Sequence, residues 1–338
     1  MTPSRFWAFV LVIGVALVAA ATLAGGATTQ AAFVDDELGD GSVTAAASFD
    51  RGPPGPRAYD DANGNGQWDQ GETTYTESDL YSFDDSSANL VVPSDVGTVN
   101  NSGSIDITAG SLTAETSFQS DSGSVSLSAT DGDADLGGQN VLAAGRADVS
   151  ATGTATVDGA AVIGVFGDSS VTGKSVSARN ANVVSYFGTT TLSARERGGG
   201  PLDATNATLQ SRYGGDIVLE SSGDMRLENA EIQAPYGDIT ADLQRGGRTL
   251  FVDGASIDDA DADNTLVYTP RGTTVDGTPA AGSVSARSGR GGGRPNTTNQ
   301  AGTPGSTWGS DRPSPERPER PINWEAIAGE LGISLSSD

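Results

Sequence analysis

The sequence predicts an all-β protein whose body is a right-handed parallel β-helix, a solenoid of stacked coils. A hydrophobic N-terminal helix is expected before this body, and a disordered C-terminal tail after it. Two observations lead to this prediction: an internal repeat of roughly 20 to 25 residues, and short runs in which apolar and small polar residues alternate. The chain has 338 residues, which is enough to bury a substantial core.

The repeat is clearest in four segments that align without gaps. Each begins with Ala, has a branched apolar residue two positions later, and ends in an aromatic residue followed by Gly. Because one coil cannot bury its own apolar face, stacked copies are expected to share a continuous core, with right-handed connections between parallel strands. A weaker fifth copy begins at Gly254. The four segments are AAVIGVFG (160–167), ANVVSYFG (181–188), ATLQSRYG (207–214) and AEIQAPYG (230–237).

Two columns of like residues are expected along the stack. Asn or Gly precedes each opening Ala, and both residues tolerate positive φ, so we expect a corner there at which Asn side chains bond to their copies. The aromatic residues are expected to stack along one edge as packing, with a sugar-binding platform as the alternative. The corner residues are Gly159, Asn180, Asn206 and Asn229, and the aromatic residues are Phe166, Phe187, Tyr213 and Tyr236.

The segment 61–72, ahead of the body, has the spacing of an EF-hand calcium loop. Oxygen-bearing side chains occupy positions 1, 3, 5 and 9, and Gly66 occupies the sharp turn at position 6. The Pro-rich approach 51–57 forbids an entering helix, so the loop resembles helix-poor extracellular calcium loops such as those of dockerin-like modules. An Asn-Gly-rich turn is the alternative. The predicted ligands of a weakly bound, structural Ca²⁺ are Asp61, Asn63, Asn65, Gln67 (through its carbonyl), Asp69 and Glu72.

The charge of the chain excludes several partners and reactions. There are 44 acidic and 19 basic residues, and Lys174 is the one lysine, so the net charge is −25. Such a surface does not suit nucleic acid or an anionic membrane, and it is typical of proteins bathed in molar salt. The absence of Cys and His removes disulfides, thiol catalysis and the usual general base. The composition resembles that of haloarchaeal secreted proteins, with an acidic mesophilic protein as the alternative, and it argues against an enzyme.

Residues 1–31 are predicted to direct export. Arg5 precedes an apolar run at 6–24, and Ala31 closes a small-residue cleavage region. The run is nearly long enough to span a bilayer, so an uncleaved membrane anchor remains an alternative to a cleaved signal peptide. The membrane is expected to be contacted through this segment alone.

The junction 25–37, GGATTQAAFVDDE, with its continuation to Asp50, resembles that of SipW-dependent-type signal peptide proteins. The resemblance is confined to the first 50 residues, and it implies secretion and a cell-surface or matrix setting. The body is similar to the coils of filamentous surface adhesins, pectin-lyase-like solenoids and polymer-forming bactofilins, without a motif that is specific to one of them.

The organisation of the chain follows from these features. The acidic run 258–263 is expected to be a solvated end-cap where the repeat decays. The terminal helix is expected to dock on the β-helix or on a partner, because a lone short helix is marginal in water. Its apolar face has Trp324, Ile327, Ala328 and Leu331, with Asn323 as N-cap. The predicted segments are a linker (32–58), the EF-hand-like calcium loop (59–75), the parallel β-helix (76–280), a disordered linker (281–321) and a short amphipathic helix (322–338).

The predicted function is that of a non-enzymatic, exported cell-surface or matrix β-solenoid with a structural or adhesive role in high salt. Its partner is expected to be a surface or matrix component, a glycan or further copies of the chain. The alternative is a carbohydrate-binding or carbohydrate-active β-helix protein. A polysaccharide lyase is disfavoured because Lys174, Arg179 and Arg195 have no recurrent acidic partners in the sequence.

Overall fold

The computed structural model describes residue 55 and residues 57–195, 198–244, 247–259, 264–268, 272–286 and 322–331. The chain divides into two compact units, Met1–Phe49 and Asp50–Asp338, and every described residue belongs to the second. The predicted export segment, residues 287–321 of the predicted linker and residues 332–338 lie outside the described residues. Within the described residues, no helix has the length and apolar character that a membrane crossing requires.

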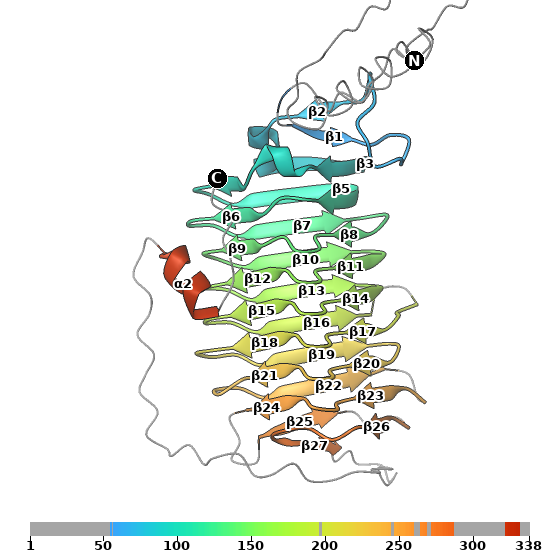
Figure 1. Ribbon diagram of the computed structural model, residues 1–338, viewed down its shortest axis with the longest axis vertical. Helices are drawn as coiled ribbons and strands as arrows, with labels where there is room; N and C mark the ends of the chain where they lie inside the picture. The colour runs from blue at the N-terminus through green and yellow to red at the C-terminus, as the bar shows by residue number, and fades with distance from the viewer. Residues whose placement is uncertain are drawn as a thin grey trace, which may run out of the picture. The chain divides into compact units, whose positions relative to one another are not determined.

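The body is a parallel β-solenoid of about nine turns, which confirms the predicted class of fold. Each full coil places one strand in a narrow sheet and two in a broad sheet (Figure 1). The broad sheet has two rows because the chain bends between a first strand and a shorter second one. The long strand β5 (Ile105–Ala114) joins the rows, since it pairs with β7 (Val125–Ala129) along its first half and with β8 (Ala134–Asp135) along its second.

The strands follow one another in a fixed order from coil to coil. The narrow sheet contains β4 (Val99–Asn101), β6 (Phe118–Ser120), β9 (Val141–Ala143), β12 (Ala161–Gly164), β15 (Asn182–Ser185), β18 (Thr208–Ser211), β21 (Glu231–Gln233) and β24 (Ser256–Asp258). The first row of the broad sheet continues from β7 through β10 (Ala147–Ala151), β13 (Ser169–Gly173), β16 (Thr190–Ala194), β19 (Ile217–Ser221), β22 (Ile239–Leu243), β25 (Thr265–Tyr268) and β27 (Ser283–Ala286). The second row continues from β8 through β11 (Thr154–Thr156), β14 (Ser175–Ser177), β17 (Leu202–Asp203), β20 (Met225–Arg226), β23 (Thr249–Phe251) and β26 (Thr274–Asp276).

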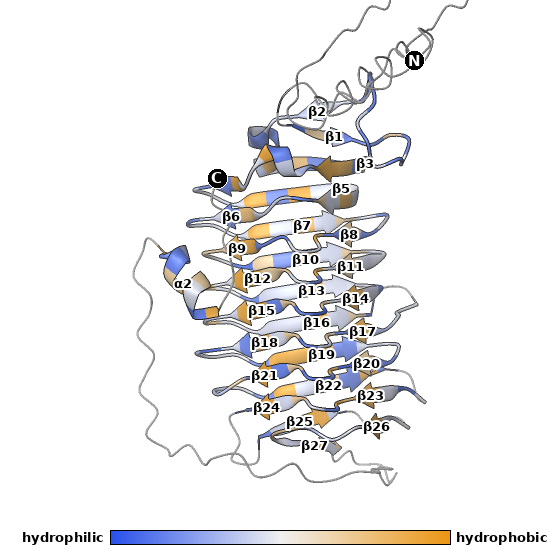
Figure 2. Ribbon diagram, viewed as in Figure 1, coloured by the Kyte–Doolittle hydropathy of each residue, from blue (hydrophilic) through white to orange (hydrophobic). Residues whose placement is uncertain are grey.

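The aligned repeats lie in register in the narrow sheet, as the sequence predicts. Val162 lies beside Val183, Val183 beside Leu209, and Leu209 beside Ile232. All four side chains are completely buried in the core inside the coils. Because alternate residues of a strand point to opposite faces, the residues next to each buried one in its own strand point outward. Apolar residues accordingly recur in strand after strand down the stack (Figure 2).

The corner that precedes each narrow-sheet strand also has the predicted geometry. Asn180, Asn206 and Asn229 have φ of 56°, 58° and 55°, and Gly159 has φ of 70° at the same place. The amide nitrogen of Asn206 donates to the side-chain oxygen of Asn180 at 3.2 Å. The left-handed backbone costs most residues about 1–2 kcal/mol, which explains why each of these positions is occupied by Asn or Gly.

The C-terminal part of the solenoid differs from the prediction. Parallel pairing continues to β27, beyond the predicted boundary at residue 280 and within the segment predicted to be a disordered linker. The acidic run is not where the stack ends, because β25, β26 and β27 follow it. Asp259 in that run is 3% exposed, and its carboxylate accepts the backbone N–H of Thr265 at 3.0 Å. The predicted solvated end-cap is therefore wrong at this residue, which instead helps to start β25.

The N-terminal edge of the solenoid is covered by a short hairpin. Strands β1 (Ala58–Asp60) and β2 (Thr74–Tyr75) pair with each other antiparallel, and β1 also pairs antiparallel with β3 (Ser82–Val92), which begins the parallel stack. Two 3₁₀ turns, Glu77–Tyr81 and Ser94–Val96, flank β3. The hairpin thus occupies hydrogen-bonding groups of an edge that would otherwise be free to pair with another chain.

The corner column gives the first testable prediction. Asn206→Ala is expected to lower the free energy of unfolding by about 2 kcal/mol, because Ala pays the left-handed backbone cost and loses the bond to Asn180. Asn206→Gly is the matched control and is expected to lose less, since Gly occupies this corner at Gly159. Denaturant melts compare the three proteins, and equal losses for Ala and Gly would contradict the backbone explanation.

Candidate functional site

The predicted calcium loop is the turn of the hairpin that covers the solenoid edge. Asp61 is 5% exposed, and its two carboxylate oxygens accept the backbone N–H groups of Asn65 at 3.1 Å and Gly66 at 2.7 Å. The side-chain oxygen of Asn63 accepts from Asn65 N at 3.0 Å, and that of Asn65 accepts from Gln67 N at 2.8 Å. Positive φ at Gly66 permits the sharp turn that position 6 requires.

The remaining two acids close the loop. The carboxylate of Glu72 accepts the backbone N–H of Ala62 at 3.1 Å and of Asp69 at 2.8 Å, which ties the end of the loop to its beginning. Asp69 accepts the side-chain amides of Asn63 at 2.6 Å and Asn65 at 2.9 Å. The structure therefore brings the side chains of the predicted acidic and amide ligands into one hydrogen-bonded loop.

The donor set fits a hard cation such as Ca²⁺. In the described part of the chain no three His, Cys, Asp or Glu side chains converge as a metal-binding cluster. Coordination would thus need the amide oxygens of Asn63 and Asn65 and the carbonyl of Gln67 in addition to the acids. All of these donors are oxygens, which Ca²⁺ prefers. The loop is also tied to the body, because Asp61 N donates to Asn89 O in β3 at 2.9 Å.

A second candidate site lies on the outer face of the narrow sheet, where α2 (Trp324–Leu331) docks (Figure 1). The outward residues of three successive coils are apolar here: Leu142, Ile163 and Val184 lie side by side in β9, β12 and β15. Each is at most 3% exposed. In the coils on either side, the same positions are occupied by Gln119 and Gln210. We call the apolar outer face made by Leu142, Ala144, Ala161, Ile163, Val165, Val184 and Tyr186 the α2 surface.

The helix meets this surface with the face that its sequence predicts. Trp324, Ile327 and Ala328 are buried, and Leu331 packs against the same cluster. The side-chain oxygen of Asn323 accepts the backbone N–H of Ala326 at 3.0 Å, which confirms the predicted N-cap. Of the two expected outcomes, docking on the β-helix is the one observed in the described residues.

Polar contacts fix α2 at both ends. The indole N–H of Trp324 donates to Asp121 at 3.2 Å, in the coil before the apolar patch. At the other end, Glu330 forms an ion pair with Arg212 and accepts from the hydroxyl of Tyr186 at 3.2 Å. Arg212 also lies over the ring of Tyr186, 4.9 Å from its centroid. Burial raises the pKa of the Tyr186 hydroxyl well above its usual value, so it is a hydrogen-bond donor at any physiological pH.

The aromatic column stacks as predicted over its first three members. The centroids of Phe166 and Phe187 are 6.0 Å apart with an interplanar angle of 16°, and Phe187 and Tyr213 are 5.3 Å apart. Phe166 and Phe187 also pack against the α2 cluster. Their ring faces are turned toward each other, so these two rings act as packing. Tyr213 and Tyr236, at 37% and 38% exposure, are the exposed large hydrophobic residues of the described chain.

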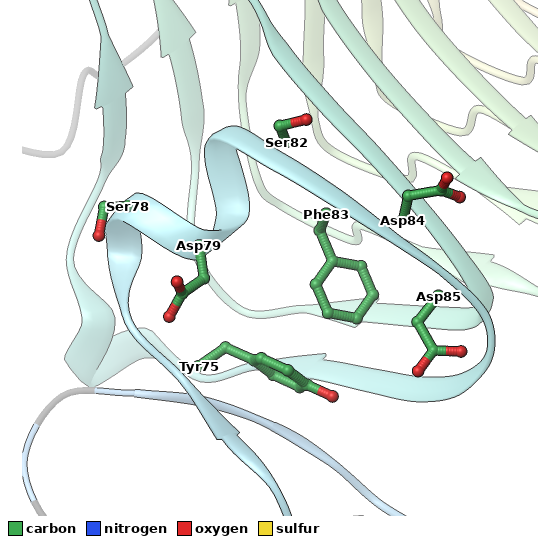
Figure 3. A pocket seen from close by; sticks show the side chains of 7 residues that line it. All are labelled: Tyr75, Ser78, Asp79, Ser82, Phe83, Asp84 and Asp85. Atoms are coloured by element: carbon green, nitrogen blue, oxygen red, sulfur yellow. The ribbon is translucent and has the colours of Figure 1, made fainter.

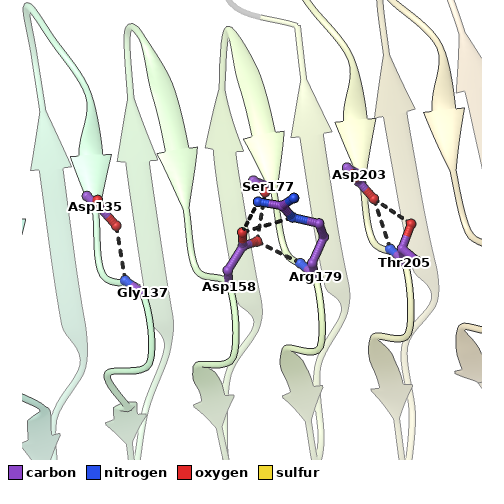
Figure 4. Close-up of polar contacts among 7 residues, drawn as sticks. All are labelled: Asp135, Gly137, Asp158, Ser177, Arg179, Asp203 and Thr205. Carbon is purple, nitrogen blue, oxygen red and sulfur yellow. Dashed lines mark hydrogen bonds and ion pairs between the residues drawn. The ribbon is translucent and has the colours of Figure 1, made fainter.

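The sequence shows no recurrent acidic partners for these arginines, but the fold brings acids of other coils to Arg179 and Arg195. Arg179 pairs with Asp158 at 2.6 Å (Figure 4). Arg195 pairs with Glu220 and, at 2.9 Å, with Asp242 on the outer face of the broad sheet. Such pairs on an exposed face contribute up to about 1 kcal/mol each.

The Asp158 pair supports the turn of the coil. Burial acts to raise the pKa of the Asp158 carboxyl, but hydrogen bonds from Arg179 and Ser177 outweigh it, so this pKa lies below the ordinary value. Asp158 is therefore a carboxylate at neutral pH. It also accepts the backbone N–H of Arg179 at 2.8 Å. Asp135 and Asp203, at the same corner in other coils, instead accept the backbone N–H two residues on in their own coil, from Gly137 and Thr205 (Figure 4).

An open hollow of about 460 Å³ lies beside the first coil, and the sequence reasoning missed it. The rings of Tyr75 and Phe83 meet edge to face there, with centroids 4.8 Å apart. Burial, followed by the charges of Asp60 and Asp85, raises the pKa of the Tyr75 hydroxyl. The signal was the mixture of aromatic and acidic residues at 75–85. The lining side chains are Tyr75, Ser78, Asp79, Ser82, Phe83, Asp84 and Asp85 (Figure 3).

The α2 surface gives the second prediction. Ile163→Asp is expected to release α2 while the solenoid stays folded, because the side chain points outward and an unpaired carboxylate under the helix costs several kcal/mol. Hydrogen exchange at the backbone amides of residues 324–331 is expected to accelerate by more than tenfold. Thr172→Asp, on an outward position of the broad sheet, is the control and should leave this exchange unchanged. Unchanged protection in Ile163→Asp would contradict the docking.

Comparison with known proteins adds no family to this description. A scan against protein-family models finds no match, and neither do searches of curated proteins and of solved structures.

Proposed function

We propose that the protein is a non-enzymatic, exported structural or adhesive solenoid of the cell surface or extracellular matrix, working in high salt. The observation behind the proposal is the body itself: coils stacked in register from β3 to β27, right-handed by expectation, with one end covered and short polar side chains on the outside. Such a stack holds its ends at a fixed distance and presents long flat faces, as a spacer or a binding surface requires.

The chemistry of the side chains supports a non-enzymatic role. The chain has no His and no Cys. The arginines that a carboxylate-dependent lyase would use, Arg179 and Arg195, are engaged in ion pairs between coils. Asp158, with a pKa below the ordinary value, is unsuited to act as a general acid.

The setting is proposed from the sequence. The segment 1–31 has the features of an export signal or membrane anchor, and the junction after it resembles that of SipW-dependent-type signal peptide proteins. The net charge of −25 suits a protein that stays soluble in molar salt. The proposed partners are surface or matrix components, a glycan or further copies of the chain, and the proposed location is the cell surface or the extracellular space.

We include a structural Ca²⁺ in the proposal. The ligands would be Asp61, Asn63, Asn65, Asp69 and Glu72, with the carbonyl of Gln67. Binding of the ion there would offset two of the three negative charges and crosslink the loop. The loop joins β1 to β2, so the expected effect is a firmer hairpin over the edge of β3.

The alternative is a carbohydrate-binding β-helix, and one observation favours it. Tyr213 and Tyr236, which follow β18 and β21, are partly exposed. The side chains of Gln210 and Gln233 form an amide pair at 3.1 Å on the outer face of these two strands. Aromatic rings beside amides suit a sugar. The alternative is weaker because the same column continues into Phe166 and Phe187, whose faces are already stacked.

The calcium loop gives the third prediction. With a Kd of about 10⁻⁴ to 10⁻³ M, as extracellular loops have, 10 mM Ca²⁺ is expected to stabilise the protein by about 1.4–2.7 kcal/mol relative to chelator. Glu72→Gln is expected to abolish this difference. Asp84→Asn, an exposed acid outside the loop, is the control and should keep it. Thermal melts at constant ionic strength measure the effect, and identical wild-type melts in calcium and chelator would leave the loop as a plain turn.

The location of the protein gives the fourth prediction. Cell fractionation followed by N-terminal sequencing is expected to find a mature chain that starts at Ala32 in the medium or matrix, because Ala31 closes the cleavage region. A chain with an intact Met1 in the membrane fraction would show that the segment is an uncleaved anchor and not a cleaved signal peptide. An intact chain in the cytoplasm would overturn the proposed function.

A further inference from the structure

The helix that covers the α2 surface comes from a distant part of the chain, and a long segment connects it to the solenoid. Residues 287–321 separate β27 from the docked segment. The pairing order β27–β25–β22–β19–β16–β13 puts Ala286 about five strand spacings, roughly 24 Å, from the coils under α2. For a chain of this length, the root-mean-square span of a random coil is roughly 30–35 Å, and the fully extended length exceeds about 100 Å.

This length reaches a neighbouring copy as easily as the chain's own body. Tethering by such a linker gives α2 a millimolar effective concentration at its own surface, which equals about one molecule per cube of 120 Å side. Copies that touch one another at a cell surface or in a matrix are less than about 120 Å apart. The surface of a neighbour then competes with the surface of the same chain.

The docked segment is also suited to exchange. It has eight helical residues, and an isolated helix of that length is marginal in water. Its stability therefore comes from the surface on which it lies, and any copy of that surface provides the same contacts. The contacts are specific as well as apolar, since Glu330 meets Arg212 and Tyr186 at one end and Trp324 meets Asp121 at the other.

We propose that α2 of one molecule docks on the α2 surface of a second copy, so that the chain links to itself by exchanging this helix. The inference rests on the proposed function, because it needs the crowding of a surface or matrix. The partner is a second copy of this chain, and the link between the two copies is the C-terminal helix. Each copy has one helix and one surface, so exchange builds closed dimers or open chains of solenoids.

The test uses two full-length variants that cannot complete the contact within one chain. The donor carries Ile163→Asp and Val184→Asp, which block its own surface but keep its helix. The acceptor carries Trp324→Ala and Ile327→Asp, which disable its helix but keep its surface. A β-sheet circular dichroism spectrum and a cooperative melt for each variant show that its solenoid is folded. Sedimentation equilibrium in molar salt, at up to about 1 mM chain, the effective concentration of the tether, measures the association.

The expected result is that each variant alone is monomeric and that an equimolar mixture forms a one-to-one complex. A mixture that sediments as two monomers overturns the inference. Association of the acceptor with itself that the donor does not change also overturns it, because it reflects exposed apolar surface only.

A charge reversal separates helix exchange from general stickiness. Adding Arg212→Glu to the acceptor is expected to weaken the complex about tenfold, and adding Glu330→Arg to the donor is expected to restore it, because the ion pair is re-formed in the opposite sense. If the first change weakens the complex and the second does not restore it, Arg212 and Glu330 do not meet between the two copies as they do within one chain. The outcome is independent of the fractionation experiment, so the self-linkage and the extracellular location fail or stand separately.

Discussion

The structure depends on one constraint: a single coil cannot bury its own apolar face. Each coil contributes small or branched residues such as Val162 and Val183 to a shared core, and their burial is complete only because another coil lies above and below. The constraint requires the in-register stacking, and with it the corner at which Asn or Gly takes positive φ. It also leaves two kinds of unfinished surface, namely the ends of the stack and any apolar residues on its outside.

Both kinds of surface are managed by segments outside the repeat. At the N-terminal end, β1 pairs with β3 in the antiparallel sense, so the edge is closed by a hairpin that cannot itself extend the parallel stack. On the outside, Leu142, Ile163 and Val184 form an apolar strip that would be exposed in a bare solenoid, and α2 covers it. The two candidate sites are thus places where a surface of the repeat is covered by another segment. The hairpin with the calcium-type loop covers the edge, and α2, at the end of a long connection, covers the apolar strip.

The sequence predicted what the repeat dictates and missed what depends on unrelated segments. The register of the narrow sheet, the left-handed Asn corner and the stacked aromatic rings follow from alignment, because like residues stack in a solenoid. The pairing of Arg179 with Asp158 was missed since the partners lie 21 residues apart, in adjacent coils whose lengths vary. The hairpin was missed because β2 has two residues and no periodicity. The apolar face of the helix around Trp324 could be predicted from the sequence. The surface on which it docks could not, because that required knowing which residues of each coil point outward.

High salt changes which contacts matter at the α2 surface. At an ionic strength of 1 M the screening length is about 3 Å, so exposed pairs such as Arg146–Asp148 contribute little. Apolar burial is not screened, and strongly hydrated salts strengthen it. The side chain of Arg212 is only 17% exposed, which keeps part of its pairing with Glu330 out of the solvent. In the medium that the composition predicts, burial of Trp324 and Ile327 therefore supplies the affinity of the helix for the solenoid, and the Arg212–Glu330 pair sets its direction.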